Sequence, residues 1–295
     1  MNCDFDMNLY KVFYVVAKNN SFSKAAEELF VTQPSVSYSI KQLEERLNIK
    51  LFKRNHAGIK ITPEGKEVLK YVKKSYDTIS IGERGLKENK ELNSGVISIG
   101  VQSHIGRFFL FPYLETFHKD YPNIEINISS RNTAELIKLL ESNDIDFVID
   151  SSPIETEYNN LTIKPLMELE HCFISSNSNY IKENSIKINE LEDYNLILPV
   201  VRSTPRKQLT ELLNEKNIKL HPFMTIETTE MLIDAVKKDM GIGYVIKKAV
   251  EEDIKNNRLK EIKVDVQLPK LLLNLVYIEN NLTYIPKIFM EEIKK

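Results

Sequence analysis

The stretch SKAAEELFVTQPSVSYSIKQLEERL, residues 23–47, decides the fold of the N-terminal part of the chain. It holds two short amphipathic segments separated by a tight turn. Ser23 is a suitable N-cap for the first segment, in which Ala25 and Leu29 would face inward. The pattern therefore predicts a short helix that begins at about Ser23 and stops near Phe30.

The second segment sets a polar face against an apolar stripe. Thr32 can cap this helix, and Pro34 suits its first turn, where a missing amide hydrogen costs nothing. Asn48 after the helix favours a left-handed C-terminal cap. The apolar stripe consists of Val36, Ile40, Leu43 and Leu47, at steps of four, three and four. Such a helix pair is typical of a helix-turn-helix, whose second helix enters the DNA major groove.

The flanking segments extend this motif. Helical spacing of apolar residues predicts a helix from about Asp6 to Asn19. LFKRNHAGIKIT, residues 51–62, has apolar residues around a basic tip with a glycine, which predicts a two-stranded wing. Thr62 and Pro63 would start a further helix. Its residues Leu69, Val72, Tyr76, Ile79, Glu83 and Leu86 recur at steps of three and four, which indicates a seam for a partner helix. Packing on the same chain is the alternative.

Side-chain chemistry divides the expected DNA contacts into two groups. Polar groups near the start of the recognition helix can reach base edges, whereas cations neutralise phosphates at any sequence. Residues 31–60 contain six Lys or Arg and two Glu. A helix pair with a merely solvated face is the alternative. The expected DNA-binding residues are Ser23, Gln33, Pro34, Ser35, Ser37, Tyr38 and Lys41, with Lys53, Arg54 and His56 in the wing.

Charge and composition restrict the class of protein. Residues 1–90 contain 16 Lys or Arg and 11 Asp or Glu, whereas the remaining residues contain 24 and 31. A basic head on an acidic body predicts that only the head meets a polyanion. The chain has neither a run of about 20 apolar residues nor a secretory signal at its start, so we expect a cytoplasmic protein without a membrane partner. Cys3 and Cys172 match no metal or CxxC spacing, and we expect no metal or cofactor.

From Ser94 onward, short apolar runs alternate with helical stretches, which predicts an α/β fold with a mainly parallel, buried sheet. In such a fold, loops at strand ends and helix N-termini are places where anions can bind, because their amide hydrogens point outward. The expected strands are VISIGV, INISS, DIDFVID, HCFIS, NLILPV, FMTIE, GIGYVI and LLLNLVYI.

Three strand-to-helix loops carry polar residues at such places, and the family resemblance described below implies that they line an effector cleft and bind the effector. Ser and Thr are also ordinary N-caps that need no ligand, which is the alternative at each position. Arg202 or Arg206 could pair with a carboxylate, so an organic anion is one candidate effector. Ser151 and Ser152 form a weaker fourth position. The loops contribute Gln102, Ser103 and His104, then Arg202, Ser203 and Thr204, and then Thr228 and Thr229.

The string SFSKAAEELFVTQPSVSYSIKQLEERLNIKLFKRNHAGIKITPEG, residues 21–65, resembles the N-terminal signature of the LysR-type transcriptional regulators. Two positions depart from it: Asn48 stands where the family usually has Gly, and Tyr38 where many members have Arg or another long polar residue. The matching elements are Ser21-Phe22-Ser23, Ala25-Ala26, Leu29, Gln33-Pro34, Ser37, Ile40, Leu43-Glu44, Leu51-Phe52, Arg54, Thr62 and Gly65.

The resemblance implies an α/β multidomain chain with an N-terminal all-α winged helix-turn-helix, a long linker helix that forms a dimer, and a C-terminal effector domain. That effector domain would resemble periplasmic solute-binding proteins, with two α/β subdomains around a ligand. The implied ranges are 1–62 for DNA binding, 63–92 for the linker, 94–165 with 268–295 for the first subdomain and 166–267 for the second.

Together these observations predict a sequence-specific DNA-binding transcriptional regulator controlled by a small molecule of unknown identity. Two recognition helices in a homodimer would bind an interrupted palindrome in double-stranded DNA. The resemblance implies a homotetramer built from two dimers, and RNA polymerase is a candidate partner. An enzyme is disfavoured because no GxSxG, HExxH or phosphate-binding glycine motif is present. A solute-binding transport protein would need export and no DNA-binding head.

Overall fold

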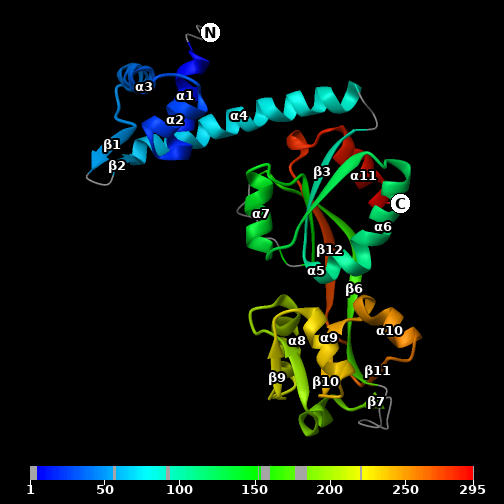
Figure 1. Cartoon of the computed structure of the whole chain (residues 1–295). Coiled ribbons are helices and arrows are strands. Elements are labelled where there is room, and N and C mark those ends of the chain that lie inside the picture. The colour runs from blue at the N-terminus through cyan, green and yellow to red at the C-terminus, as the bar shows by residue number, and fades with distance from the viewer. Residues whose placement is uncertain are drawn as a thin grey trace. The chain divides into compact units, whose positions relative to one another are not determined.

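The computed structural model describes residues 5–55, 58–90, 94–151, 153, 160–176, 185–219 and 221–294. The chain divides into two compact units, Met1–Arg84 and Gly85–Lys295. Both are visible in Figure 1, in which the chain runs from blue to red. Among the helices that the structure describes, none combines the length and apolarity needed to cross a bilayer.

The first unit is built on helices α1 (Met7–Asn19), α2 (Phe22–Glu28) and α3 (Gln33–Leu47). Their common core contains Phe13, Val16, Ala25, Val36 and Leu43, which are all fully or almost fully buried. The predicted helix pair is therefore confirmed, and small Ala25 lets α2 lie close to its neighbours.

The caps of these helices correct one expectation. Thr32 caps α3 as predicted, accepting a 3.4 Å hydrogen bond from the amide of Ser35. However, α2 is capped by Ser21, whose hydroxyl accepts from the amide of Lys24 at 3.3 Å. Ser23 lies inside α2 and is exposed, so its prediction as the N-cap is wrong. Both serines are chemically competent caps, and only Ser21 has the extended backbone that a cap requires.

Backbone conformation also ends two of the helices. Asn48 caps α3 in the left-handed region at φ 53°, as its residue type predicted. Phe30 follows α2 with φ 55°, a conformation that a bulky residue adopts rarely. This left-handed residue reverses the chain between α2 and α3, and leaves the Phe30 ring 96% exposed.

The predicted wing is present as strands β1 (Phe52–Asn55) and β2 (Gly58–Ile61), which pair antiparallel. Helix α4 (Pro63–Lys90) follows, and Thr62 joins it to the wing. The Thr62 hydroxyl donates to the carbonyl of Lys50 at 2.6 Å and accepts from the amide of Gly65 at 2.9 Å. A Cβ atom at Gly65 would lie 2.4 Å from the carbonyl oxygen of Leu51, so the close approach of α4 to the wing requires glycine.

The seam on α4 is only partly free for a partner helix. Val72 is buried in the core of the first unit, and Leu69 and Tyr76 pack against that core. For these residues the alternative interpretation, packing on the same chain, is correct. Further along α4, Ile79 is 47% and Leu86 is 67% exposed.

In the second unit, one end of the sheet contains β3 (Gly95–Val101), β4 (Ile124–Ser129), β5 (Phe147–Asp150) and β12 (Lys270–Tyr277), in the order β4-β3-β5-β12. The strands β4, β3 and β5 are parallel, whereas β12 is antiparallel to β5. Phe117, Phe147 and Phe289 pack together in this core. The surrounding helices are α5 (Ser103–Ile105), α6 (Phe111–Asp120), α7 (Thr133–Glu141) and α11 (Tyr284–Ile293), with a π-helical turn at Gly106–Leu110.

The other end of the sheet contains β10 (Ile242–Ile246), β8 (Leu196–Pro199) and β9 (Met224–Ile226), which are parallel. Helices α8 (Thr204–Glu215) and α9 (Thr229–Lys237) contribute buried leucines to two adjoining cores. Further short elements, which the sequence pattern did not predict, are β7 (Ser185–Ile186), β11 (Leu259–Val264) and α10 (Glu251–Lys255).

One long strand, β6 (Thr162–Ser176), belongs to both ends of the sheet, as Figure 1 shows. It pairs with β12 as far as Glu170 and with β10 from His171 onward. Only its second half, HCFIS, was predicted as a strand. Opposite Pro165 the register with β12 shifts between Leu273 and Asn274. A proline has no amide hydrogen for the ladder, which accounts for an irregularity at this place.

Candidate functional site

The recognition helix α3 presents its predicted polar residues away from the core. Gln33, Ser35 and Tyr38 are exposed and Ser37 is half-buried. The Gln33 amide donates to the Ser37 hydroxyl at 3.0 Å. The Tyr38 hydroxyl accepts from the amide of Gln42 at 3.1 Å. These contacts fix side-chain directions along one helix face, while leaving further donors and acceptors available for base edges.

The basic residues lie on α3 and in the wing. Lys41 pairs with Glu45 at 3.5 Å, and both side chains are largely exposed, so this weak pair is easily exchanged for a phosphate contact. Lys53 is exposed on β1. Arg54 also lies on β1, but its side chain is outside the described residues, as is the whole of His56. Pro34 stands in the first turn of α3, as predicted.

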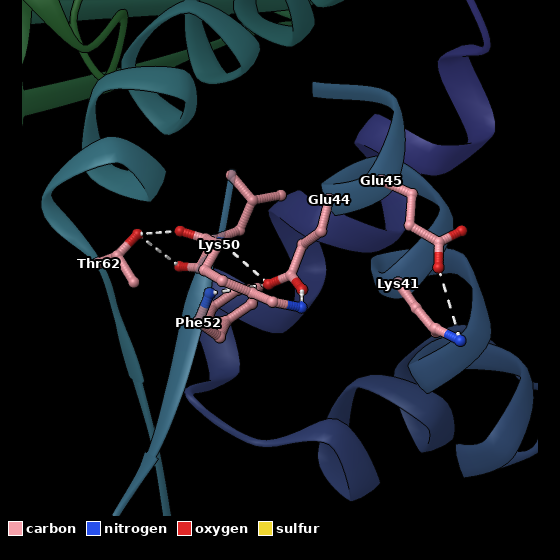
Figure 2. Close-up of polar contacts among 7 residues, drawn as sticks. Lys41, Glu44, Glu45, Lys50, Phe52 and Thr62 are labelled. Atoms are coloured by element: carbon pink, nitrogen blue, oxygen red, sulfur yellow. Dashed lines mark hydrogen bonds and ion pairs between the residues drawn. The ribbon is translucent and has the colours of Figure 1, made fainter. Parts of the chain in front are cut away.

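Glu44, which matches the family signature, connects the recognition helix to the wing, and this contact was not predicted from the sequence. Its carboxylate is buried and accepts from the backbone amides of Leu51 at 2.8 Å and Phe52 at 3.3 Å. Lys50 lies 2.6 Å from its other oxygen. Figure 2 shows Glu44 directed toward the start of the wing, whereas Glu45 pairs with Lys41 on another face of α3. An acidic residue beside the apolar stripe of α3 was the signal that could have indicated this contact.

The second unit contains a cavity of about 650 Å³ where the two ends of its sheet meet. It is lined by the start of α7 at Asn132 and Thr133, and by the N-termini of α8 and α9. Every effector-binding residue named from the sequence, apart from the undescribed Ser152 and the alternative Arg206, contributes to the lining. These residues are Gln102, Ser103, His104, Ser151, Arg202, Ser203, Thr204, Thr228 and Thr229. Their role in binding an effector stays a prediction.

A hydrogen-bonded group organises one wall of this cavity. Asp150 is fully buried at the end of β5. Its carboxylate accepts from the amide of Gln102 at 3.0 Å and from the hydroxyl of Thr133 at 2.7 Å. The carboxylate thereby fastens the loop after β3 to the start of α7. Thr133 was missed by sequence reasoning, although it also follows a strand and begins a helix.

Two polar contacts lie at the mouth of the cavity. The Ser103 hydroxyl, at the start of α5, donates to Glu230 on α9 at 2.8 Å and thus joins the two ends of the sheet. Arg202 forms an ion pair with Glu227. Arg206 lies on α8, and burial lowers the pKa of its guanidinium.

The serine and threonine residues at the helix starts do not all act as caps. Thr228 caps α9 through a 3.4 Å bond from the amide of Met231. Ser203 instead donates to the carbonyl of Val200 at 2.8 Å and makes no side-chain cap of α8. The first amides of α8 therefore keep their capacity to bind an anion in the cavity.

The floor of the cavity contains a ring pair that sequence reasoning also missed. His171 on β6 and Tyr244 on β10 are stacked, with ring centroids 5.0 Å apart and planes at 16°. The Nδ1 atom of His171 lies 2.9 Å from the carbonyl oxygen of Pro269. Burial lowers the pKa of His171 and raises the pKa of the Tyr244 phenol, so both rings are kept uncharged. Each residue lies inside an apolar strand, a setting that does not indicate a ligand site.

The thiol of Cys172 is not a reactive site. Burial raises the pKa of Cys172 to about 12, which keeps its thiol protonated and inert. Within those ranges, no group of three or more His, Cys, Asp or Glu side chains could hold a metal ion.

A winged helix-turn-helix and a two-part ligand-binding domain define the class: a DNA-binding transcriptional regulator that responds to a small molecule. Residues 7–66 match the family model described as bacterial regulatory helix-turn-helix protein, lysR family. Residues 90–293 match the LysR substrate binding domain. The chain belongs to the LysR family, which is a family of regulators and not of enzymes.

Curated relatives and solved structures agree with this assignment. A probable RuBisCO transcriptional regulator of Thalassiosira pseudonana is 29% identical over 268 residues, covering 88% of this chain and 87% of the relative. The RuBisCO operon transcriptional regulator of Allochromatium vinosum is 25% identical over 261 residues, covering 86% and 84%. A full-length OxyR variant from Pseudomonas aeruginosa has the same fold, with a TM-score of 0.65 at 18% identity over 98% of this chain and 96% of that one.

Proposed function

We propose that this regulator binds an interrupted palindrome in double-stranded DNA as a homodimer, that two dimers form a tetramer, and that a small organic anion in the cavity sets its transcriptional output. The cavity carries the proposal. Polar residues from loops far apart in the sequence line one space, and that space is of the size that binds small molecules.

The chemistry of the cavity favours an anion. Three helices, α7, α8 and α9, begin at its wall, and each N-terminus presents amide hydrogens and the positive end of a helix dipole. Arg131 adds a cation to the lining. Two carboxylates also line the cavity, and their repulsion of a bound anion is reduced. Glu227 is paired with Arg202, and Glu230 accepts a hydrogen bond from Ser103.

The contact between Ser103 and Glu230 suggests how an effector acts. It joins the two ends of the sheet, which the long strand β6 also connects. A ligand that competes for Ser103, or that adds contacts across the same gap, favours one arrangement of the subdomains over another. The DNA bend, or contact with RNA polymerase, would then change.

Dimerisation through α4 is supported by its uncovered apolar residues. Ile79 and Leu86 are spaced seven residues apart and are both largely exposed. Two such faces cover each other in a helix pair, and a dimer places two recognition helices on one stretch of DNA.

The test combines a ligand screen with footprinting. A panel of small carboxylic acids at 10 mM or below is added to the full chain during thermal unfolding, and any acid that raises the melting temperature is then added to DNase I footprints. We expect at least one acid to stabilise the chain and to alter its footprint. The proposal is wrong if no acid does either. A matched control is Ser75→Ala, an exposed serine on α4 in the other unit, which should respond to acids as the parent does.

A further inference from the structure

Two polar atoms at the floor of the cavity have no hydrogen-bond partner among the residues that the structure describes: Nε2 of His171 and the hydroxyl oxygen of Tyr244. His171 is 6% exposed and Tyr244 is fully buried, and both residues line the cavity. A buried polar group without a partner is costly, and such groups in folded proteins are rare. Two of them beside each other in a ligand cavity point to a partner that enters from the cavity.

The hydrogen-bonding roles of the two atoms follow from their surroundings. The carbonyl oxygen of Pro269 can only accept, so the proton of a neutral His171 ring lies on Nδ1. Nε2 is then an acceptor. The phenol of Tyr244 keeps its proton because burial raises its pKa, so its hydroxyl is a donor. The floor therefore offers one acceptor and one donor on stacked rings.

We propose that His171 and Tyr244 together recognise a hydroxyl group of the effector, which makes the effector a hydroxylated organic acid. A hydroxyl donates to Nε2 of His171 and accepts from Tyr244, satisfying both atoms. A carboxylate can only accept and would meet the lone pair of Nε2, and a methyl group would leave both atoms unsatisfied. The carboxylate of the same molecule is left for the helix N-termini, so this inference rests on the proposed function of the cavity.

The place of the pair in the fold connects this recognition to the movement of the subdomains. His171 is the first residue of β6 that pairs with β10, directly after Glu170, the last that pairs with β12. Its Nδ1 contact, Pro269, lies in the segment that returns from β11 to β12 and so passes between the two ends of the sheet. A hydroxyl bound to Nε2 therefore attaches to the point where both crossing segments meet.

The experiment measures the preference for a hydroxyl by calorimetric titration of the full chain with matched acids. The pairs are malate and succinate, lactate and propionate, and 3-hydroxybenzoate and benzoate. We expect the hydroxylated member of at least one pair to bind about tenfold or more tightly, since its absence leaves buried polar groups unpaired. Tyr244→Phe, which keeps the ring, should bring the ratio of the two dissociation constants close to one.

Tyr277→Phe is the matched control, because Tyr277 is equally buried but lies outside the cavity lining. It should keep the preference. His171→Phe, which preserves the stacked ring, should lose the preference as Tyr244→Phe does, and circular dichroism verifies that each variant is folded.

The outcomes separate the two proposals. If acids bind but the parent chain shows no preference for a hydroxyl, or if both His171→Phe and Tyr244→Phe keep it, the inference is overturned and the proposed function stands. If no acid of either kind binds at 10 mM, both are overturned.

Discussion

The carboxylate of Glu44 accepts a 2.8 Å hydrogen bond from the backbone amide of Leu51, and this contact holds the wing against the recognition helix. The two residues belong to different elements, α3 and the start of the wing. Glu44 also accepts a hydrogen bond from the backbone amide of Phe52. One buried carboxylate therefore supplies the acceptor for two buried backbone amides at the start of the wing. The position of the wing on DNA therefore depends on a residue that need not contact DNA.

Glu44→Ala should lower the free energy of unfolding of the first unit by about 1–3 kcal/mol, because buried amides lose their acceptor. Urea denaturation followed by circular dichroism measures this change, which suits a chain with no tryptophan. Glu45→Ala is the control: its carboxylate is exposed and pairs with Lys41 at the surface, so its loss should change stability by less than about 0.5 kcal/mol. Equal losses of stability in the two variants would show that Glu44 does not hold the wing against the recognition helix.

Arg54→Ala should weaken binding to every DNA sequence, because we assign this wing residue to a phosphate contact. The slope of log affinity against log salt should become shallower by about 0.9, as one counterion fewer is released. Lys187 is an exposed lysine in the second unit, so Lys187→Ala should leave the slope unchanged. A loss of discrimination at a single base pair, with the slope intact, would instead assign Arg54 to base recognition.

Ser103→Ala should reduce the response to the effector and leave DNA affinity intact. The substitution removes the hydroxyl that donates to Glu230 across the cavity, without disturbing the first unit. The measurement is the effector dose response of transcription in vitro, together with a mobility shift in the absence of effector. An unchanged dose response would exclude Ser103 from the mechanism.

The free energy of unfolding of the second unit, Gly85–Lys295, should fall as the pH is lowered below about 6.5. Burial lowers the pKa of His171 from its ordinary value of 6.5, so the unfolded chain binds a proton that the folded chain resists. Stability from this neutral ring is complete above the unfolded pKa and declines as the pH falls, by at most about 1.4 kcal/mol per pH unit for one group. His104, whose pKa burial also lowers, acts in the same direction.

Thermal unfolding of the parent chain and of His171→Phe between pH 7.5 and 5.5 tests this dependence. The variant should lose less stability on acidification than the parent. Identical slopes would show that His171 titrates alike in the folded and unfolded chains.

The sequence predicted the features that depend on neighbouring residues. Helix starts and ends depend on residues within one helical turn. Residue type alone was therefore enough to predict the roles of Thr32, Asn48 and Pro63. The start of α2 was misplaced because Ser21 and Ser23 are both competent caps, and backbone conformation decides between them.

Features that depend on distant contacts were missed. Glu44 acquires its role only when the wing folds back on α3, seven and eight residues further along the chain. His171 and Tyr244 lie within apolar strands, and they come together in the lining of a cavity only because β6 pairs with β10. In contrast, Ser103, Ser203 and Thr228 stand at strand-to-helix loops, and parallel strands bring such loops to one edge of a sheet.

The most direct test of the central claim is selection of random double-stranded DNA by the full chain, followed by sequencing of the bound fraction. We expect enrichment of an interrupted palindrome whose half-sites are separated by about one helical turn or a multiple of it. Gln33→Ala should alter the enriched half-site, whereas Lys187→Ala should not. Bound DNA without any enriched sequence would show that the polar face of α3 does not read bases, and the chain would then not be a sequence-specific regulator.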